Sequence, residues 1–231
     1  MCVDKRNPTG DYYKNRDFLI QQEKDMFARC AGGHGVYLNL GCGSRILPGF
    51  VNVDRYHEAL GVLRNDITEL PNIINGSADL IFSAHSLEHV RHRLTMRTLK
   101  RWSDVLRLGG ELWLSMPDLD LCCKAFVDNP SDHKLRQWLR YTLFGYQAPM
   151  GLPDDTERDD PGQYHVAGYS QSEMEMMLLN VGITPEWAYR YDGWATPSFF
   201  ILGRKQWTGR LEQKKFYSTT AAQCLSACRA M

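Results

Sequence analysis

The sequence predicts a doubly wound α/β fold, with a mostly parallel sheet of about seven strands and an antiparallel hairpin at its C-terminal end. Three observations support this prediction. Short apolar runs typical of buried strands alternate with segments of helical periodicity. Glycine turns or a proline end several of these runs, and polar residues follow them, at the sheet edge where parallel strands bind ligands. The 231 residues, of which 43% are hydrophobic, suffice for one domain with a substantial core.

Charge and cysteine content narrow the class of protein. The 27 Lys and Arg residues balance 27 Asp and Glu residues, and this zero net charge disfavours nucleic acid as a partner. No stretch has the length of an apolar membrane span, and the first residues lack the apolar segment of a secretory signal. The seven cysteines form no CxxC pair. We therefore expect reduced thiols, a cytoplasmic location, no membrane association and no metal site.

The N-terminal half contains most of the predicted strands. Residues 1–34 form a helical segment, in which apolar positions from Phe18 to Phe27 predict an amphipathic helix that ends near Gly32 and packs over the following domain. Four short strands are expected after it, at residues 35–40, 50–53, 63–66 and 78–83.

A longer helix is predicted from His92 to Leu108, and Gly109 with Gly110 is expected to end it. The fifth strand, Glu111 to Met116, follows and ends at Pro117.

The C-terminal half predicts two helices and a hairpin. Apolar residues on one helical face predict a helix over 131–146. Ser170 with Glu173 forms a capping box that opens the next helix. Strands at 183–191 and 198–204 close the sheet as a hairpin.

Two C-terminal segments have no place in the predicted sheet. After Lys205 the pattern fades, and we treat 205–231, including Cys224 and Cys228, as a peripheral tail. The acidic segment 154–160 is interpreted as a solvated loop rather than a cation site.

Acidic residues follow two neighbouring predicted strands. Asp54 comes directly after the second strand and Asp66 ends the third, while the first strand runs into Gly41-Cys42-Gly43. The carboxylate of Asp54 can accept hydrogen bonds from both hydroxyls of a ribose. Asp66 is placed to accept a hydrogen bond from the amino group of adenine. Glycines let the backbone approach a ligand closely. The arrangement therefore suits a nucleoside.

The glycine turn differs from a dinucleotide site. Such a site reads G-x-G-x-x-G with an acid about 20 residues further on. Here position 46 is Ile, and Asp54 follows Gly43 by eleven residues, which leaves no room for a full crossover helix. A ligand without a diphosphate is therefore favoured.

Four successive motifs resemble the class I methyltransferases that use S-adenosylmethionine. These are LNLGCGSRILPGFVNVDR, RNDITELP, ADLIFSAHSLEHV and RLGGELWLSMPD, in the expected order between Gly35 and Asp118. The likeness is nearest to bacterial members that act on small molecules or cell-surface sugars. The resemblance implies a Rossmann-like methyltransferase domain over 35–204, with 118–169 as its acceptor-binding insertion.

The same resemblance assigns residues to the cofactor. The methionine portion is expected to contact Leu40, Gly41, Cys42 and Gly43; the adenosine is expected to contact Asp54, Arg55, Asp66 and Ile67; and the remaining wall is expected to contain Ser83 and His85. Ser44-Arg45 replaces the further glycine that many relatives carry after this turn.

A group that accepts a proton helps methyl transfer to an acceptor whose proton has a high pKa, such as a sugar hydroxyl. We expect His165 in this role, His85 as the second candidate, and Asp118 as the orienting partner. The acceptor is a small molecule whose oxygen or nitrogen is methylated, such as a sugar. Three alternatives stay open: a non-catalytic subunit that binds S-adenosylmethionine, a nicotinamide-dependent dehydrogenase, and transfer of another group from a modified cofactor. The sequence does not indicate an oligomeric state.

Overall fold

A computed structural model describes residues 12–146, 161–193 and 196–206 of the chain. The strands are β1 (Tyr37–Leu40), β2 (Val51–Asp54), β3 (Val62–Arg64), β4 (Ala78–Ala84), β5 (Leu106–Pro117), β6 (Ile183–Gly193) and β7 (Thr196–Lys205). They form one sheet in the order β3-β2-β1-β4-β5-β7-β6. The first five strands are parallel, and β7 is antiparallel to both β5 and β6. The predicted fold class is confirmed.

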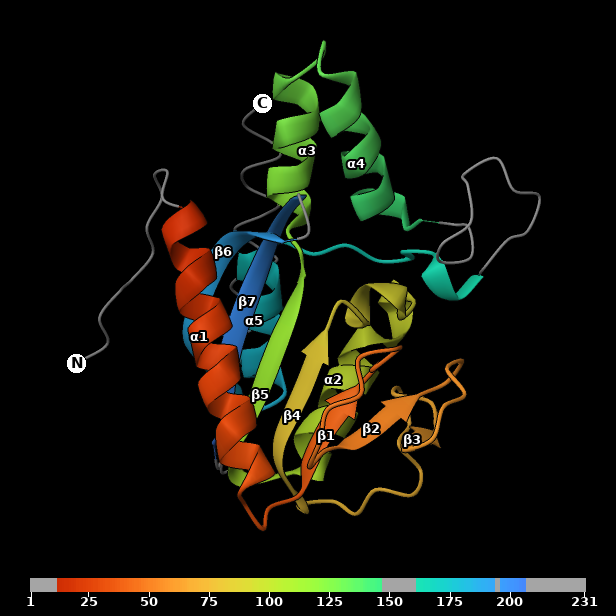
Figure 1. Cartoon of the computed structure of the whole chain (residues 1–231), viewed down its shortest axis with the longest axis vertical. Coiled ribbons are helices and arrows are strands. Elements are labelled where there is room, and N and C mark those ends of the chain that lie inside the picture. The colour runs from red at the N-terminus through yellow and green to blue at the C-terminus, as the bar shows by residue number, and fades with distance from the viewer. Residues whose placement is uncertain (1–11, 147–160, 194–195, 207–231) are drawn as a thin grey trace, which may run out of the picture.

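Helices cover both faces of this sheet (Figure 1). They are α1 (Tyr12–Ala31), α2 (His92–Val105), α3 (Leu119–Asp128), α4 (His133–Phe144) and α5 (Gln171–Asn180), with 3-10 turns η1 (Leu87–His89) and η2 (Pro161–Gln163). Helix α1 lies on one face, and α2 and α5 lie on the other. Helices α3 and α4 form a hairpin beyond the carboxyl ends of the parallel strands. This hairpin stands over the edge at which the predicted site residues lie.

Two apolar clusters fill the layers between sheet and helices. Behind the sheet, Leu99 and Trp102 of α2 and Met174 of α5 pack on buried strand residues such as Leu38. In front, buried side chains of α1, of the segment before β2 and of the sheet form the second cluster: Met26, Cys30, Leu47, Phe50, Leu80, Phe82, Trp113, Phe200 and Leu202. The predicted packing of the N-terminal helix over the domain is therefore confirmed.

The chain enters β5 earlier than its periodicity predicts. Helix α2 ends at Val105, and Leu106 already pairs with Ala78 of β4, so Gly109 and Gly110 lie within the strand and do not end the helix. The register shifts between Ala78 and Leu80, and Gly109 there has φ +74°. Leu106 is fully buried. Strand pairing and burial outweigh the helical spacing at this point.

Of two further helices, α3 was missed by the sequence analysis and α5 begins where it was predicted. Helix α3 was not predicted, because Pro117 and Asp118 were interpreted only as the end of a strand; Asp118 in fact caps it by accepting from Leu121 N. Helix α5 begins as predicted, since the Ser170 hydroxyl accepts from Glu173 N at 3.3 Å.

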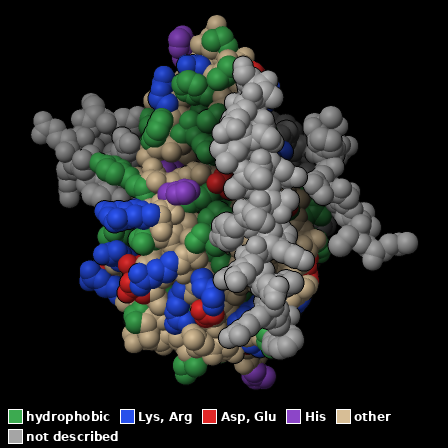
Figure 2. Space-filling view, turned by 180° about the vertical axis from the view of Figure 1, so that it is seen from behind, with side chains coloured by type: hydrophobic (Ala, Val, Ile, Leu, Met, Phe, Trp, Pro, Cys, Tyr) green, Lys and Arg blue, Asp and Glu red, His purple; other side chains and the backbone are tan. Residues whose placement is uncertain are grey.

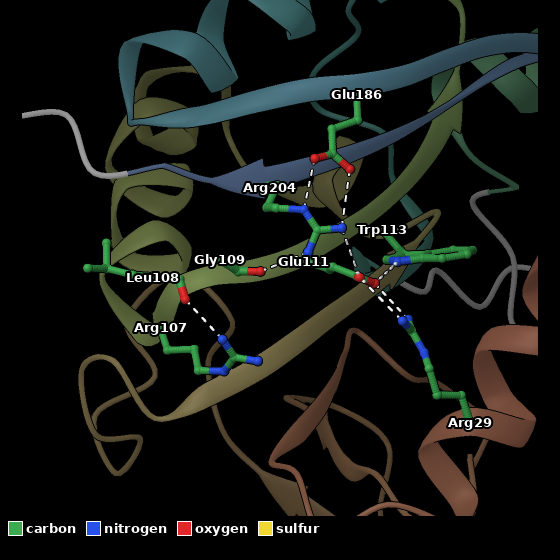
Figure 3. A network of polar contacts seen from close by, with 8 residues as sticks. All are labelled: Arg29, Arg107, Leu108, Gly109, Glu111, Trp113, Glu186 and Arg204. Atoms are coloured by element: carbon green, nitrogen blue, oxygen red, sulfur yellow. Dashed lines mark hydrogen bonds and ion pairs between the residues drawn. The ribbon is translucent and has the colours of Figure 1, made fainter.

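Glu111 joins three elements at the amino edge of the sheet (Figure 3). Its carboxylate lies 2.7 Å from Arg29 of α1 and 3.2 Å from Arg204 of β7, and accepts from Trp113 Nε1 at 3.0 Å. Arg204 also contacts Glu186 of β6 at 2.8 Å. Burial raises the pKa of Glu111, but the donors Arg29 and Trp113 lower it more, so the net pKa is below its usual value. The network links α1 to the C-terminal hairpin.

Seen from behind, the molecule carries lysine and arginine side chains over the lower part of its surface (Figure 2). On α2, the exposed side chains of Arg97 and Lys100 pair with Glu69 and Asp104. No helix in the described ranges is both long and apolar enough to cross a membrane. The acidic segment 154–160 and residues 207–231, with Cys224 and Cys228, lie outside the described residues.

Candidate functional site

The glycine turn after β1 contains two glycines with different roles. The N–H groups of Gly41 and Cys42 both donate to Val53 O, which ties the turn to β2. Gly41 (φ +68°) and Gly43 (φ +48°) are both left-handed. A Cβ on Gly41 would lie 2.3 Å from the Cβ of Ser86, whereas nothing lies within 4 Å of one on Gly43. Gly41 is therefore required by packing, and Gly43 leaves open space.

Asp54 ends β2 and bonds directly to this turn. Its Oδ2 accepts from Gly43 N at 2.9 Å, and its Oδ1 accepts from Tyr56 N and His57 N at 2.8 and 2.9 Å. A carboxylate offers about four acceptor positions. The remaining position is on Oδ2, which suits one ribose hydroxyl rather than the two that we expected.

Asp66 lies beside Asp54, in the loop after β3. Arg55 Nη1 contacts Asp66 Oδ2 at 3.0 Å, and Thr68 donates to Oδ1 through both its N–H and its hydroxyl. Asn65 N donates to Asp54 O at 3.0 Å, so the two loops lie together. The carboxylate of Asp66 thus shapes this loop, and its contact with adenine stays a prediction.

Asn65 is a site residue that the sequence analysis missed. It is buried, and its amide nitrogen has no hydrogen-bond partner, while its Oδ1 accepts from Asp66 N. A buried donor without a partner is costly, and a ligand acceptor would satisfy it. Its position between β3 and Asp66 was the available signal. The backbone of the next predicted residue, Ile67, is fixed by a hydrogen bond, because its carbonyl accepts from Trp102 Nε1 at 2.7 Å.

Three of the residues that the resemblance assigns to the cofactor are buried. Leu40 and Ser83 are fully buried, and Cys42 is 5% exposed. Ser83 shares a hydrogen bond with Ser86, whose hydroxyl donates to Leu40 O at 3.2 Å. Burial, with the nearby charge of Asp54, raises the pKa of Cys42 to about 11, which keeps this thiol neutral. These residues support the glycine turn from below.

Three histidines surround a buried carboxylate where β4 ends. His85 has φ +51°, a backbone conformation that costs a non-glycine residue about 1 to 2 kcal/mol. Its Nδ1 lies 3.2 Å from Glu88 Oε1. The rings of His89 and His165 contact each other at 4.7 Å and 82°. One ligand atom each from Glu88, His89 and His165 lie within 4.8 Å of one another.

The carboxylate of Glu88 is 1% exposed. His85 is within ion-pair distance, but its ring N–H does not meet hydrogen-bond geometry, and neither carboxylate oxygen has a hydrogen-bond partner. Burial raises the pKa of Glu88, but the proximity of His85, His89 and His165 lowers it more, so the net pKa is below its usual value. The protein therefore holds a buried negative charge here.

Backbone hydrogen bonds bring His165 to this place. Val166 N and Ala167 N both donate to Glu88 O, at 2.9 and 3.1 Å, and His165 N donates to Phe144 O at 3.1 Å. Burial, more than any other influence, lowers the pKa of His165 below its usual value. A small cavity of about 20 Å³ lies against the cluster; its lining is Glu88, Met116, Pro117, Leu119, Thr142, Leu143, His165, Ala167 and Gly168.

Asp118 does not orient His165. His165 Nδ1 contacts Thr142 O at 2.7 Å, and the fully buried Asp118 instead contacts Arg190 Nε at 2.8 Å while it caps α3. The expected orienting role is therefore wrong on geometry: a backbone carbonyl holds the ring, and Asp118 anchors the helical hairpin.

Comparisons with known proteins agree with this geometry. Residues 48–114 match a family model described as a methyltransferase domain. The fold is similar to that of an S-adenosylmethionine-dependent methyltransferase from Methanosarcina mazei, with 14% identity and a TM-score of 0.53 over 74% of this chain and 92% of that one. It is also similar to the 1,6-didemethyltoxoflavin-N1-methyltransferase of Burkholderia thailandensis, crystallised with bound 1,6-didemethyltoxoflavin and S-adenosylhomocysteine.

The second similarity has 16% identity and a TM-score of 0.50, over 88% of this chain and 93% of that one. At such identities the two structures show the fold alone. No curated protein sequence matches the chain.

The seven-stranded sheet has the fold of these methyltransferase structures, and residues 48–114 match a methyltransferase domain. The matched domain makes the enzyme an S-adenosylmethionine-dependent methyltransferase, and S-adenosylmethionine is its cofactor. The open face of Gly43 and the partnerless amide of Asn65 fit that cofactor.

Proposed function

We propose that this enzyme methylates an oxygen or nitrogen of a small-molecule acceptor, such as a sugar, as a member of the bacterial small-molecule and cell-surface-sugar type. One observation supports the proposal most. The open turn at Gly43, bonded to Asp54, lies on the same sheet edge as the cavity between Glu88 and His165. The turn that would hold the nucleoside thus shares one edge with a small cavity in which Glu88 and His165 are the titratable side chains among mostly apolar ones.

The cofactor supplies a methyl group already activated on a sulfonium, so the protein's main task is positioning. In our proposal Asp54 Oδ2 accepts from a ribose hydroxyl, and the Asn65 amide donates to the adenine beside the loop of Asp66. Gly43 leaves room for the amino-acid portion. In the same proposal Gly41, Arg55, Ile67 and His85 contribute to the surface around the cofactor, and the buried residues Leu40, Cys42 and Ser83 support it from beneath.

The acceptor enters from the side of residues 118–169. Half-exposed Trp138 of α4 forms part of this side, with Tyr141 in edge contact at 5.8 Å. His165 is the first candidate to accept a proton from the acceptor, since its lowered pKa keeps the ring neutral, and His85 is the second.

The free thiols Cys30, Cys42, Cys122 and Cys123 support a reducing, cytoplasmic location.

Calorimetry and a transfer assay test the proposal together. The full chain is titrated with S-adenosylhomocysteine and with NAD, and methyl transfer from labelled S-adenosylmethionine is followed over a panel of sugars, amines and phenols. We expect S-adenosylhomocysteine to bind and NAD not to bind. His165→Ala should lower turnover with unchanged S-adenosylhomocysteine affinity, whereas His34→Ala, an exposed histidine at the opposite edge, should change neither.

Three results would contradict the proposal. Binding without turnover on any acceptor would favour the non-catalytic subunit, and binding of NAD alone would favour a dehydrogenase. Normal turnover of His165→Ala across the pH range would exclude His165 as proton acceptor.

A further inference from the structure

The geometry points to a divalent transition-metal site of the zinc type, formed by Glu88, His89 and His165. The inference extends the proposed function, on which it rests for the place of the acceptor: the ion would bind an oxygen or nitrogen of the acceptor at its open position. His165 would then serve as a ligand, and His85, the second candidate, would accept the proton. Two imidazoles and one carboxylate are an established ligand set for Zn²⁺ and for other divalent transition metals.

The buried charge of Glu88 is the first argument. A carboxylate that is 1% exposed, with no hydrogen bond to either oxygen, is a costly arrangement in an interior. His85 Nδ1 lies 3.2 Å from Oε1 without meeting hydrogen-bond geometry, and Oε2 has no partner. A bound cation would compensate this carboxylate directly.

The hydrogen bonds of the two histidines are the second argument. His89 Nδ1 contacts Tyr164 O at 3.0 Å, and His165 Nδ1 contacts Thr142 O at 2.7 Å. A carbonyl only accepts, so each ring donates from Nδ1, and the neutral form of each ring has its lone pair on Nε2, where an ion could bind. Metal-binding histidines are held in this way, with the second ring nitrogen donating to a backbone carbonyl or a carboxylate.

Space and rigidity are the third argument. The ligand atoms lie within 4.8 Å of one another, somewhat wider than around a bound zinc ion, so the side chains would draw in slightly on binding. The cavity of about 20 Å³ beside Glu88 and His165 has room for one water-sized species. Hydrogen bonds from Val166 N and Ala167 N to Glu88 O hold the two halves of the site together.

Metal binding is measured on the full chain after chelation and dialysis, without reference to activity. Zn²⁺ binding is titrated by calorimetry, and Co²⁺ binding is followed by its visible absorption. Mn²⁺ is titrated as a third metal ion. We expect one equivalent of Zn²⁺ and a Co²⁺ spectrum typical of nitrogen and oxygen ligands. His89→Ala and His165→Ala should each weaken Zn²⁺ binding by at least about tenfold. His34→Ala should bind like the parent protein.

Glu88→Gln should also weaken Zn²⁺ binding. Circular dichroism and thermal melting check that each variant is folded. If Glu88→Gln does not fold, the two histidine variants decide whether the site exists. The inference is overturned if the parent protein binds no Zn²⁺ or Co²⁺, or if the folded histidine variants bind as the parent does. S-adenosylhomocysteine binding is measured on the same samples. Its persistence without metal binding would overturn the metal site alone, and its absence would overturn the proposed function.

Discussion

The carboxylate of Asp54 accepts the N–H of Gly43 at 2.9 Å, so the acid at the end of β2 holds the glycine turn after β1. The same carboxylate accepts from Tyr56 N and His57 N. One residue therefore positions both loops and keeps one acceptor position toward the cleft. The ribose contact and the shape of the turn depend on each other.

Asp54→Ala should weaken S-adenosylhomocysteine binding about tenfold or more, because a charge-assisted hydrogen bond contributes about 1.5 to 3 kcal/mol and the turn loses its anchor. Calorimetry measures this effect. Glu58→Gln, an exposed acid in the same loop, is the matched control and should bind normally. An unchanged affinity of Asp54→Ala would refute the ribose assignment.

The two glycines of the turn should respond differently to alanine. Gly41→Ala places a Cβ against Ser86 in a left-handed backbone and should destabilise the fold by about 2 to 5 kcal/mol. Gly43→Ala meets no protein atom and should cost only about 1 to 2 kcal/mol, but its methyl group projects into the cofactor cleft.

Thermal melting and S-adenosylhomocysteine titration separate these effects. Gly61→Ala, which is also left-handed and open, should show the stability loss of Gly43→Ala without its loss of affinity. Equal affinity in the Gly43 and Gly61 variants would mean that the cofactor does not approach Gly43.

Asp118→Ala should lower the free energy of unfolding. The fully buried side chain caps α3 and pairs with Arg190, and both contacts are lost. Arg190 is partly exposed and can be solvated, so we expect a loss of about 1 to 3 kcal/mol by chemical denaturation. The exposed Asp128→Ala, at the end of the same helix, should cost less. A stable Asp118→Ala variant would contradict the anchoring role.

Glu111 should make the fold sensitive to acid. Its folded pKa is lowered below the ordinary value of 4.5, so its charged form contributes stability above that pH. This contribution is lost as the pH falls below 4.5 through the folded pKa.

In Glu111→Gln the stability should be lower by about 1 to 2 kcal/mol at neutral pH and should depend less on pH in the acid range. Denaturant unfolding at several pH values measures both. The exposed Glu58→Gln variant serves again as control. Parallel stability curves for the parent and Glu111→Gln would show that the Arg29 and Arg204 contacts contribute no pH dependence.

The sequence by itself determined the order of strands and turns, because local apolar runs, glycines and capping residues such as Ser170 act over a few neighbouring positions. That order predicted the sheet and placed Gly43, Asp54 and Asp66 at one edge. It failed at Gly109 and Gly110, where pairing with a distant strand outweighed local helical preference.

Only the tertiary structure decided how His165 and Asp118 are used. His165 reaches Glu88 through backbone hydrogen bonds between segments far apart in the chain, and Asp118 meets Arg190 across the sheet. Such contacts depend on how helices and loops pack beyond the strand ends, which no local pattern of residues encodes. For this reason only the folded chain shows that Glu88, His89 and His165 lie close together.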